Sequence, residues 1–195
     1  MLGVWNSLVF QTAQRFRRTV QKAELGGRVI VFFVTKRLAF GSKVRLNRHV
    51  EKLQELGVTH VIDVRKYASK KLRKFRTVHL NFKDDAHPRP MWFYAQALRF
   101  YRKALDQPNS KVYVMCRAGR RRSASMTYFL LRASGLGSST AELKIRRARP
   151  CIQIVRAYRK SSEQYLLLKK IRPIRPLSLK QVAGLSEQMR APRLA

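Results

Sequence analysis

The most informative segment of the chain is KVYVMCRAGRRRSASM, residues 111–126. Its opening residues are apolar and partly β-branched, which predicts a buried strand over 111–115. A short loop follows that contains one glycine and four arginines. Residues 123–133 then have helical character and stop at a glycine-rich turn. The segment therefore predicts a strand, a tight basic loop and a helix in succession.

The loop in this segment has the composition of an anion-binding site. Backbone N–H groups of a short loop can turn inward, and the N-terminus of the next helix adds positive potential. Arg122, at the start of the predicted helix, can hold two phosphate oxygens with its planar guanidinium. Such surroundings stabilise the thiolate of Cys116, and a thiolate is a good nucleophile at neutral pH. The residues alone thus indicate a phosphate site with a reactive cysteine.

Patterns on both sides of this segment predict alternating strands and helices. Strands are expected over 29–34, 58–64 and 76–82, and helices over 44–56, 91–105, from 138 onward, and 161–170. A basic loop over 66–74 and a proline-containing loop over 84–90 connect some of them. This order predicts an α/β fold with a mostly parallel central sheet flanked by helices.

The chain divides into three predicted parts, of which residues 28–170 form the globular domain. In residues 1–27, apolar side chains recur every three to four residues opposite arginines and lysine, which predicts a basic amphipathic helix. Three interpretations of it are open: residues 1–25 lie on an anionic membrane surface, direct import into an organelle, or dock on the domain itself. Residues 171–195 are predicted to be a basic C-terminal tail.

Composition limits the partners without selecting one. Lys and Arg number 43 against 10 Asp and Glu, a net charge of +33, so the protein should attract phosphorylated ligands, acidic lipids or nucleic acid. No apolar run is long enough to predict a transmembrane helix. Two cysteines do not make a disulfide scaffold, and zinc motifs are missing, so we expect no metal and no other cofactor. We expect a cytoplasmic protein, with peripheral membrane contact or organelle import as alternatives.

The spacing of Cys116, Arg122 and Ser123 resembles the Cys-x5-Arg-Ser signature of the cysteine-dependent tyrosine and dual-specificity phosphatases. Gly119 stands where that superfamily has its loop glycine. Further segments are similar to the opening strand, the next strand and an Arg-Pro turn of dual-specificity domains: LAFGS at 38–42, LGVTHVIDV at 56–64 and RPCI at 149–152. The resemblance covers roughly residues 29–170 and implies a dual-specificity phosphatase-like fold.

This resemblance implies a role for each matching residue. Cys116 would attack phosphorus and form a phosphocysteine, Arg122 would hold the equatorial oxygens, and Ser123 would stabilise the departing thiolate. No metal is required. The backbone of the loop would bind the substrate phosphate through Arg117, Ala118, Gly119, Arg120, Arg121 and Arg122.

The superfamily also implies a general acid, an Asp on a loop after a strand. Asp84 and Asp85 are the adjacent acid pair of the 84–90 loop. The family spacing of an acid, two residues and a proline fits Asp85, which we favour. A spacing of three residues, also seen in the family, fits Asp84. In the remaining interpretation, the pair only caps the loop or neutralises nearby arginines.

Substrate class and activity have more than one interpretation. Basic residues at 117 and 120 are similar to those of lipid-directed branches, and the loop is closest to the mitochondrial PTPMT-type lipid phosphatases. The predicted function is hydrolysis of phosphate monoesters on phosphoprotein (Tyr, Ser or Thr) or on anionic phospholipid. Met115 stands where the family usually has His, which helps to orient the loop. The alternative is therefore a weak or inactive phosphatase fold that binds phosphorylated partners or RNA through its basic surface.

Overall fold

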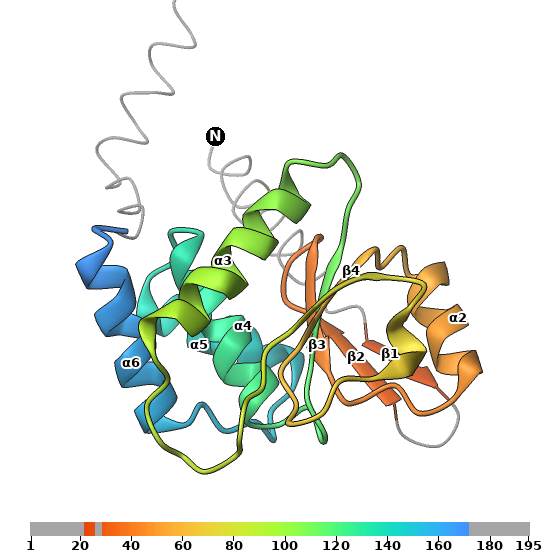
Figure 1. The fold of residues 1–195 in the computed structure, drawn as a ribbon, viewed down its shortest axis with the longest axis horizontal. Helices are drawn as coiled ribbons and strands as arrows, with labels where there is room; N and C mark the ends of the chain where they lie inside the picture. Colours follow the sequence, from red (N-terminus) through yellow and green to blue (C-terminus); the bar gives the residue numbers. More distant parts are fainter. Residues whose placement is uncertain (1–21, 26–28, 172–195) are drawn as a thin grey trace, which may run out of the picture.

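The computed structural model describes residues 22–25 and 29–171, and its core is a six-stranded sheet (Figure 1). The strand order is β1-β2-β3-β6-β4-β5, in which β3, β6, β4 and β5 run parallel and β2 pairs antiparallel with both β1 and β3. This confirms the predicted α/β class and the largely parallel sheet. The strands are β1 (Lys22–Leu25), β2 (Val29–Phe33), β3 (Leu38–Gly41), β4 (His60–Asp63), β5 (Arg76–His79) and β6 (Val112–Met115).

Helices cover both faces of the sheet unequally. The larger core contains side chains of α3, α4, α5 and α6, whereas the smaller core contains those of α2 and the short 3-10 helix η1. Figure 1 shows α2 apart from the group formed by α3 to α6. The bounds are α2 (Asn47–Glu55), η1 (Lys70–Leu72), α3 (Met91–Leu105), α4 (Arg122–Ala133), α5 (Ser138–Ala148) and α6 (Arg156–Leu168).

Strand β6 lies in the interior of the sheet and is buried on both faces. Val112 and Val114 contribute to the larger core together with Cys116, while Tyr113 and Met115 contribute to the smaller core. This alternation is the period of two that a pleated strand imposes. The uninterrupted apolar run is therefore explained, because neither face of this strand reaches water.

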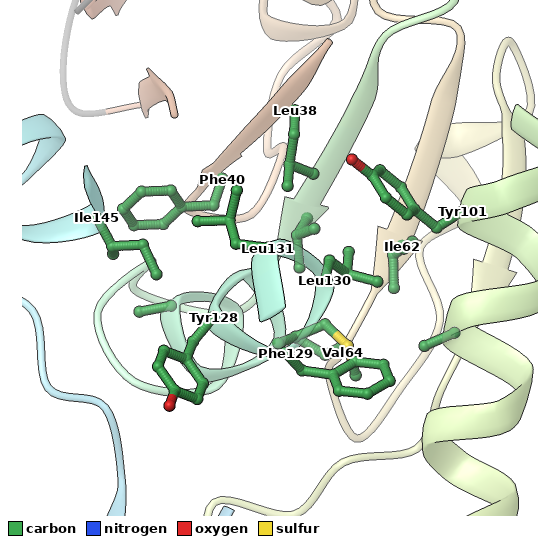
Figure 2. Close-up of a cluster of buried hydrophobic side chains, with 14 of the residues drawn as sticks. Leu38, Phe40, Ile62, Val64, Tyr101, Tyr128, Phe129, Leu130, Leu131 and Ile145 are labelled. Atoms are coloured by element: carbon green, nitrogen blue, oxygen red, sulfur yellow. The ribbon is translucent and has the colours of Figure 1, made fainter. Parts of the chain in front are cut away.

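The larger core forms the support on which the loop after β6 rests. Figure 2 shows side chains of the strands meeting those of α3, α4 and α5 in this core. Each fully buried aliphatic or aromatic side chain contributes roughly 1.5–3 kcal/mol to folding. The labelled members from the strands and α4 include Leu38, Phe40, Ile62, Phe129, Leu130 and Leu131.

The prediction of a helix over residues 1–27 is wrong for residues 22–25. These residues form β1, which pairs antiparallel with β2. Without β1, one edge of β2 would present unpaired N–H and C=O groups, and strand pairing satisfies them. The rest of the predicted N-terminal helix and the tail from residue 172 lie outside the described residues.

Smaller differences concern element ends and one missed element. Helix α6 begins at Arg156, five residues before the predicted start at 161, and η1 falls within the predicted 66–74 loop. Residues 91–105 form α3 as predicted. Among the described residues, no helix combines the length and apolar character needed to cross a membrane.

Candidate active site

A cavity of about 410 Å³ opens at the carboxyl edge of the four parallel strands. Ligands of open α/β sheets bind at this edge because the loops that follow parallel strands converge there. Tyr67 and Asp84 form part of the wall. The other lining side chains are all cationic: Lys43, Arg65, Lys66, Lys83, Arg117 and Arg122.

Cys116 directly follows β6 and begins the loop that leads to α4, with only 2% of its surface exposed. Its Sγ accepts a hydrogen bond from the backbone N–H of Gly119 at 3.2 Å. The Ser123 Oγ lies 3.3 Å from the same sulfur. The backbone amide of Gly119 and the hydroxyl of Ser123 therefore both lie against this sulfur.

The carbonyl groups of residues 117–120 all accept hydrogen bonds from residues outside the loop. Their hydrogen-bond donors, in chain order, are Lys43 N–H for Arg117 (3.4 Å), Arg149 Nη1 for Ala118 (3.1 Å) and Gly119 (2.8 Å), and Gln153 N–H for Arg120 (3.0 Å). Of the loop amides, the Gly119 N–H is directed inward, to Cys116 Sγ. The loop can therefore offer backbone donors to an oxyanion, as a nest of amides does.

Gly119 and Arg149 fix the shape of the loop. Gly119 has φ +69°, a conformation that costs little only for glycine. A Cβ there would lie 2.5 Å from the backbone carbon of Gly41, so no side chain fits. Arg149 is buried and packs its guanidinium 5.0 Å from the ring centre of Phe32. A glycine turn and a buried arginine thus hold the loop in place.

The guanidinium of Arg122 is anchored on one side and open on the other. Its Nη1 donates a hydrogen bond to the carbonyl of Phe82 at 2.9 Å, and the residue is 8% exposed. Its Nε is buried and makes no hydrogen bond within the described structure, although Asp84 Oδ2 lies 3.5 Å away. An unsatisfied buried donor is costly. A phosphate oxygen would therefore be a favourable partner for this group.

The two acids of the 84–90 loop have different surroundings. Asp84 lines the cavity and contacts both Arg122 and Arg121, whose Nη1 lies 3.3 Å from Asp84 Oδ1. Asp85 instead accepts hydrogen bonds from the backbone N–H of His87 (3.1 Å) and from the side chain of Arg89. The structure therefore brings Asp84 to the loop of residues 116–122, called the phosphate loop below. It turns Asp85, the general acid that the sequence favoured, toward other residues of the 84–90 loop.

Helix α6 holds this acid loop in position. The Tyr158 hydroxyl accepts a hydrogen bond from Ala86 N–H at 2.9 Å and donates one to the carbonyl of Lys83 at 3.2 Å. The Arg89 guanidinium packs over the rings of Tyr158 and Phe82, 5.3 and 4.8 Å from their centres. The tyrosine thus fixes the backbone on both sides of the acid pair.

The remaining predicted residues lie at the rim of the loop or away from it. Arg117, Ala118 and Arg120 are exposed, and Arg121 is partly exposed. Met115 is buried in the smaller core, on the α2 side of the sheet. It therefore offers no polar contact to the loop, as the sequence led us to expect.

Several functional candidates were not predicted from the sequence. Lys43, Arg65, Lys66 and Lys83 join the cavity although no motif includes them. Each follows the end of a parallel strand by a few residues. This position could have indicated that they lie near the site, because ligands of such sheets bind beyond the carboxyl ends of the strands. In the sequence, Arg149 is recognisable only as part of an Arg-Pro turn, because its contact with the loop spans 31 residues of sequence.

With this geometry in place, comparison with known proteins identifies the family. The sequence profile of the dual specificity phosphatase catalytic domain matches residues 38–170, and the chain belongs to this family. Among curated protein sequences, none matches the chain.

Solved structures with the same fold include several phosphatases. PTPMT1 in complex with PI(5)P superposes with a TM-score of 0.61 at 20% identity, covering 71% of this chain and 94% of that one. A mouse putative dual specificity phosphatase complexed with zinc tungstate gives 0.65 at 19% identity, covering 77% and 97%. The human tyrosine phosphatase-like serine/threonine/tyrosine-interacting protein gives 0.64 at 20% identity, covering 72% and 97%. At these identities the likeness establishes the fold.

Proposed function

We propose that this protein is a cysteine-dependent phosphatase that hydrolyses phosphate monoesters of phosphoprotein or anionic phospholipid through a phosphocysteine. The observation that carries the proposal is the arrangement around one sulfur. Cys116 Sγ accepts a hydrogen bond from Gly119 N–H and lies beside Ser123, within a loop whose carbonyls are engaged elsewhere. Arg122, at the other end of this loop, lines the cavity of about 410 Å³ together with the other cations.

The first chemical step transfers the phosphoryl group to sulfur. The Cys116 thiolate attacks phosphorus, the bond from phosphorus to the leaving oxygen breaks, and Asp84 gives its proton to that oxygen. Arg122 and the loop amides hold the three equatorial oxygens, whose charge must be neutralised in the transition state. A bound phosphate competes with the Asp84 carboxylate for Arg122, which frees the acid for proton transfer.

The second step returns the enzyme to its starting state. Water attacks phosphorus, Asp84 accepts a proton from it, and the bond from sulfur to phosphorus breaks. The Ser123 hydroxyl, 3.3 Å from Sγ, donates a hydrogen bond to the departing thiolate. Inorganic phosphate leaves, and each residue has the proton with which it began.

The direct test is hydrolysis of p-nitrophenyl phosphate in the presence of a metal chelator. Cys116→Ser should abolish turnover, whereas Cys151→Ser, which changes an exposed cysteine, should retain it. Ser123→Ala should slow the second step, so that mass spectrometry of rapidly denatured enzyme finds a phosphoryl group on Cys116. No turnover by the wild type, or equal turnover by Cys116→Ser, would reject the proposal.

A further inference from the structure

Four cations line the cavity without a part in the proposed chemistry. They are Lys43, Arg65, Lys66 and Lys83, and they share the cavity wall with Arg122. The reacting phosphate already has Arg122 and the loop amides as partners. Like charges gathered in a cavity repel one another, so these four side chains would be stabilised by a bound anion.

The fold itself gathers these cations. Lys43 follows β3, Arg65 and Lys66 follow β4, and Lys83 follows β5. These strands are parallel to β6, so their carboxyl ends lie along the edge of the sheet from which the phosphate loop emerges. The cluster thus combines side chains from three separate loops in the lining of a single cavity.

Arg65 is held rigidly at this wall. Its Nε and Nη2 donate to the two carboxylate oxygens of Asp63 at 2.8 and 2.7 Å, and the Asp63 side chain is fully buried. The Arg65 side chain is 15% exposed, and its carbonyl contacts His79 Nε2 at 3.0 Å. A guanidinium that is fixed in this way loses little conformational freedom when it meets an anion.

Asp63 pairs with Arg65 and Asp84 contacts Arg122, but the positive charges of Lys43, Lys66 and Lys83 have no carboxylate within salt-bridge distance among the described residues. Among the described residues that line it, Asp84 is the one carboxylate, and Asp84 pairs with arginines of the phosphate loop. Burial, and then the charges of Arg45, Arg117 and Arg65, lower the pKa of Lys43. An anion bound beside Lys43 would offset the repulsion between its ammonium group and these arginines.

We propose that Lys43, Arg65, Lys66 and Lys83 form a second-phosphate subsite, which binds a phosphate group on the leaving-group side of the substrate. The substrate class is then a compact bisphosphate, either free in solution or borne by a lipid headgroup. Several cations around a concavity suit a phosphate, which has more acceptor oxygens and more charge than a carboxylate. A volume of about 410 Å³ also falls in the range of small-molecule sites. This inference rests on the proposed function, because it places the second phosphate relative to the first.

The test compares two substrates that differ by one phosphate, propyl phosphate and 1,3-propanediol bisphosphate. We expect Lys43→Met combined with Lys83→Met to lower the ratio of their kcat/KM values, bisphosphate over monophosphate, about tenfold or more. Lys160→Met is the charge-matched control, because Lys160 is an exposed lysine that lines a different cavity. Its ratio should stay within twofold of the wild-type value. An unchanged ratio in the double variant overturns the proposal.

A binding measurement separates this proposal from the proposed catalysis. In a Cys116→Ser background, calorimetry with 1,3-propanediol bisphosphate should show binding that Lys43→Met with Lys83→Met weakens about tenfold or more. This result supports the subsite even if the wild type has no turnover. Equal binding with and without the two lysines rejects the subsite even if the enzyme is active.

Two further arms identify the source of the second phosphate. Phosphatidylinositol monophosphate in phosphatidylcholine vesicles tests the lipid-borne form, and 1,3-propanediol bisphosphate tests the soluble form. If the double variant lowers activity on either substrate, the subsite is supported, and the affected substrate shows whether the second phosphate is lipid-borne or soluble. Sensitivity confined to a doubly phosphorylated peptide would overturn the proposal in favour of a protein substrate.

Discussion

Gly119→Ala should damage catalysis through the position of the phosphate loop. The added Cβ would lie 2.5 Å from the backbone carbon of Gly41 and 2.7 Å from both Ser42 N and Arg149 Nη1. Ordinary contact begins near 3.4 Å. Gly41 belongs to β3 and pairs with β6, so the loop must yield, by roughly 1 Å, and a misplacement of that size costs about 100-fold in rate. The positive φ and the clash together cost about 2–4 kcal/mol of folding stability.

The assay is kcat/KM for p-nitrophenyl phosphate, measured below the melting temperature of each variant, together with thermal unfolding. Gly57→Ala is a matched control because Gly57 also has positive φ, +76°, while its Cβ would meet only the flexible end of Lys111 at 3.3 Å. We expect Gly57→Ala to lose about 1 kcal/mol of stability and to retain wild-type kcat/KM. A kcat/KM for Gly119→Ala within threefold of wild type would refute the argument that this glycine shapes the loop.

Three further predictions concern single side chains. Asp84→Asn should lower kcat/KM for phenyl phosphate, a poor leaving group, by about 100-fold, while Asp85→Asn should lower it by less than threefold; the reverse order would make Asp85 the acid. Arg122→Lys should lower kcat/KM for p-nitrophenyl phosphate by about 100-fold or more, since an ammonium cannot replace a planar two-point contact, and near-normal turnover would contradict the mechanism. Burial opposes ionisation of Glu163, but hydrogen bonds led by Arg132 outweigh it and lower the pKa of Glu163. This carboxylate therefore stabilises the fold at neutral pH, and its contribution disappears as the pH falls through the lowered pKa. Denaturant unfolding of Glu163→Gln should show a loss of about 1–2 kcal/mol at pH 7 that shrinks at pH values below about 4, and a loss independent of pH would refute this.

The segment from β6 to α4 could be predicted from the sequence because its determinants are local. An apolar run predicts the buried strand, and Cys116, Arg122 and Ser123 are linked by a short loop whose spacing restricts their positions. The structure accordingly brings Ser123 and the Gly119 amide to the sulfur of Cys116. Helix α3 was likewise predictable, since the apolar period over 91–105 belongs to one continuous helix.

Long-range pairing decided what the local pattern could not. Residues 22–25 belong to a stretch whose sequence pattern predicts an amphipathic helix. They form β1 instead, because the edge of β2 offers hydrogen-bond partners to their backbone. The choice between Asp84 and Asp85 depended on contacts with Arg89, Arg121 and Arg122, which residue counting cannot resolve.

The amino-acid sequence determined the α/β class and the short loop that links Cys116 to Arg122 and Ser123, because both follow from patterns that are local along the chain. Only the tertiary structure decided which other charges surround them. Lys43, Arg65 and Lys83 are far apart in sequence and meet because parallel strands direct their following loops to one edge of the sheet. The residues of the loop from Cys116 to Ser123 are therefore positioned by local sequence, whereas the cations around them are brought together by the tertiary fold.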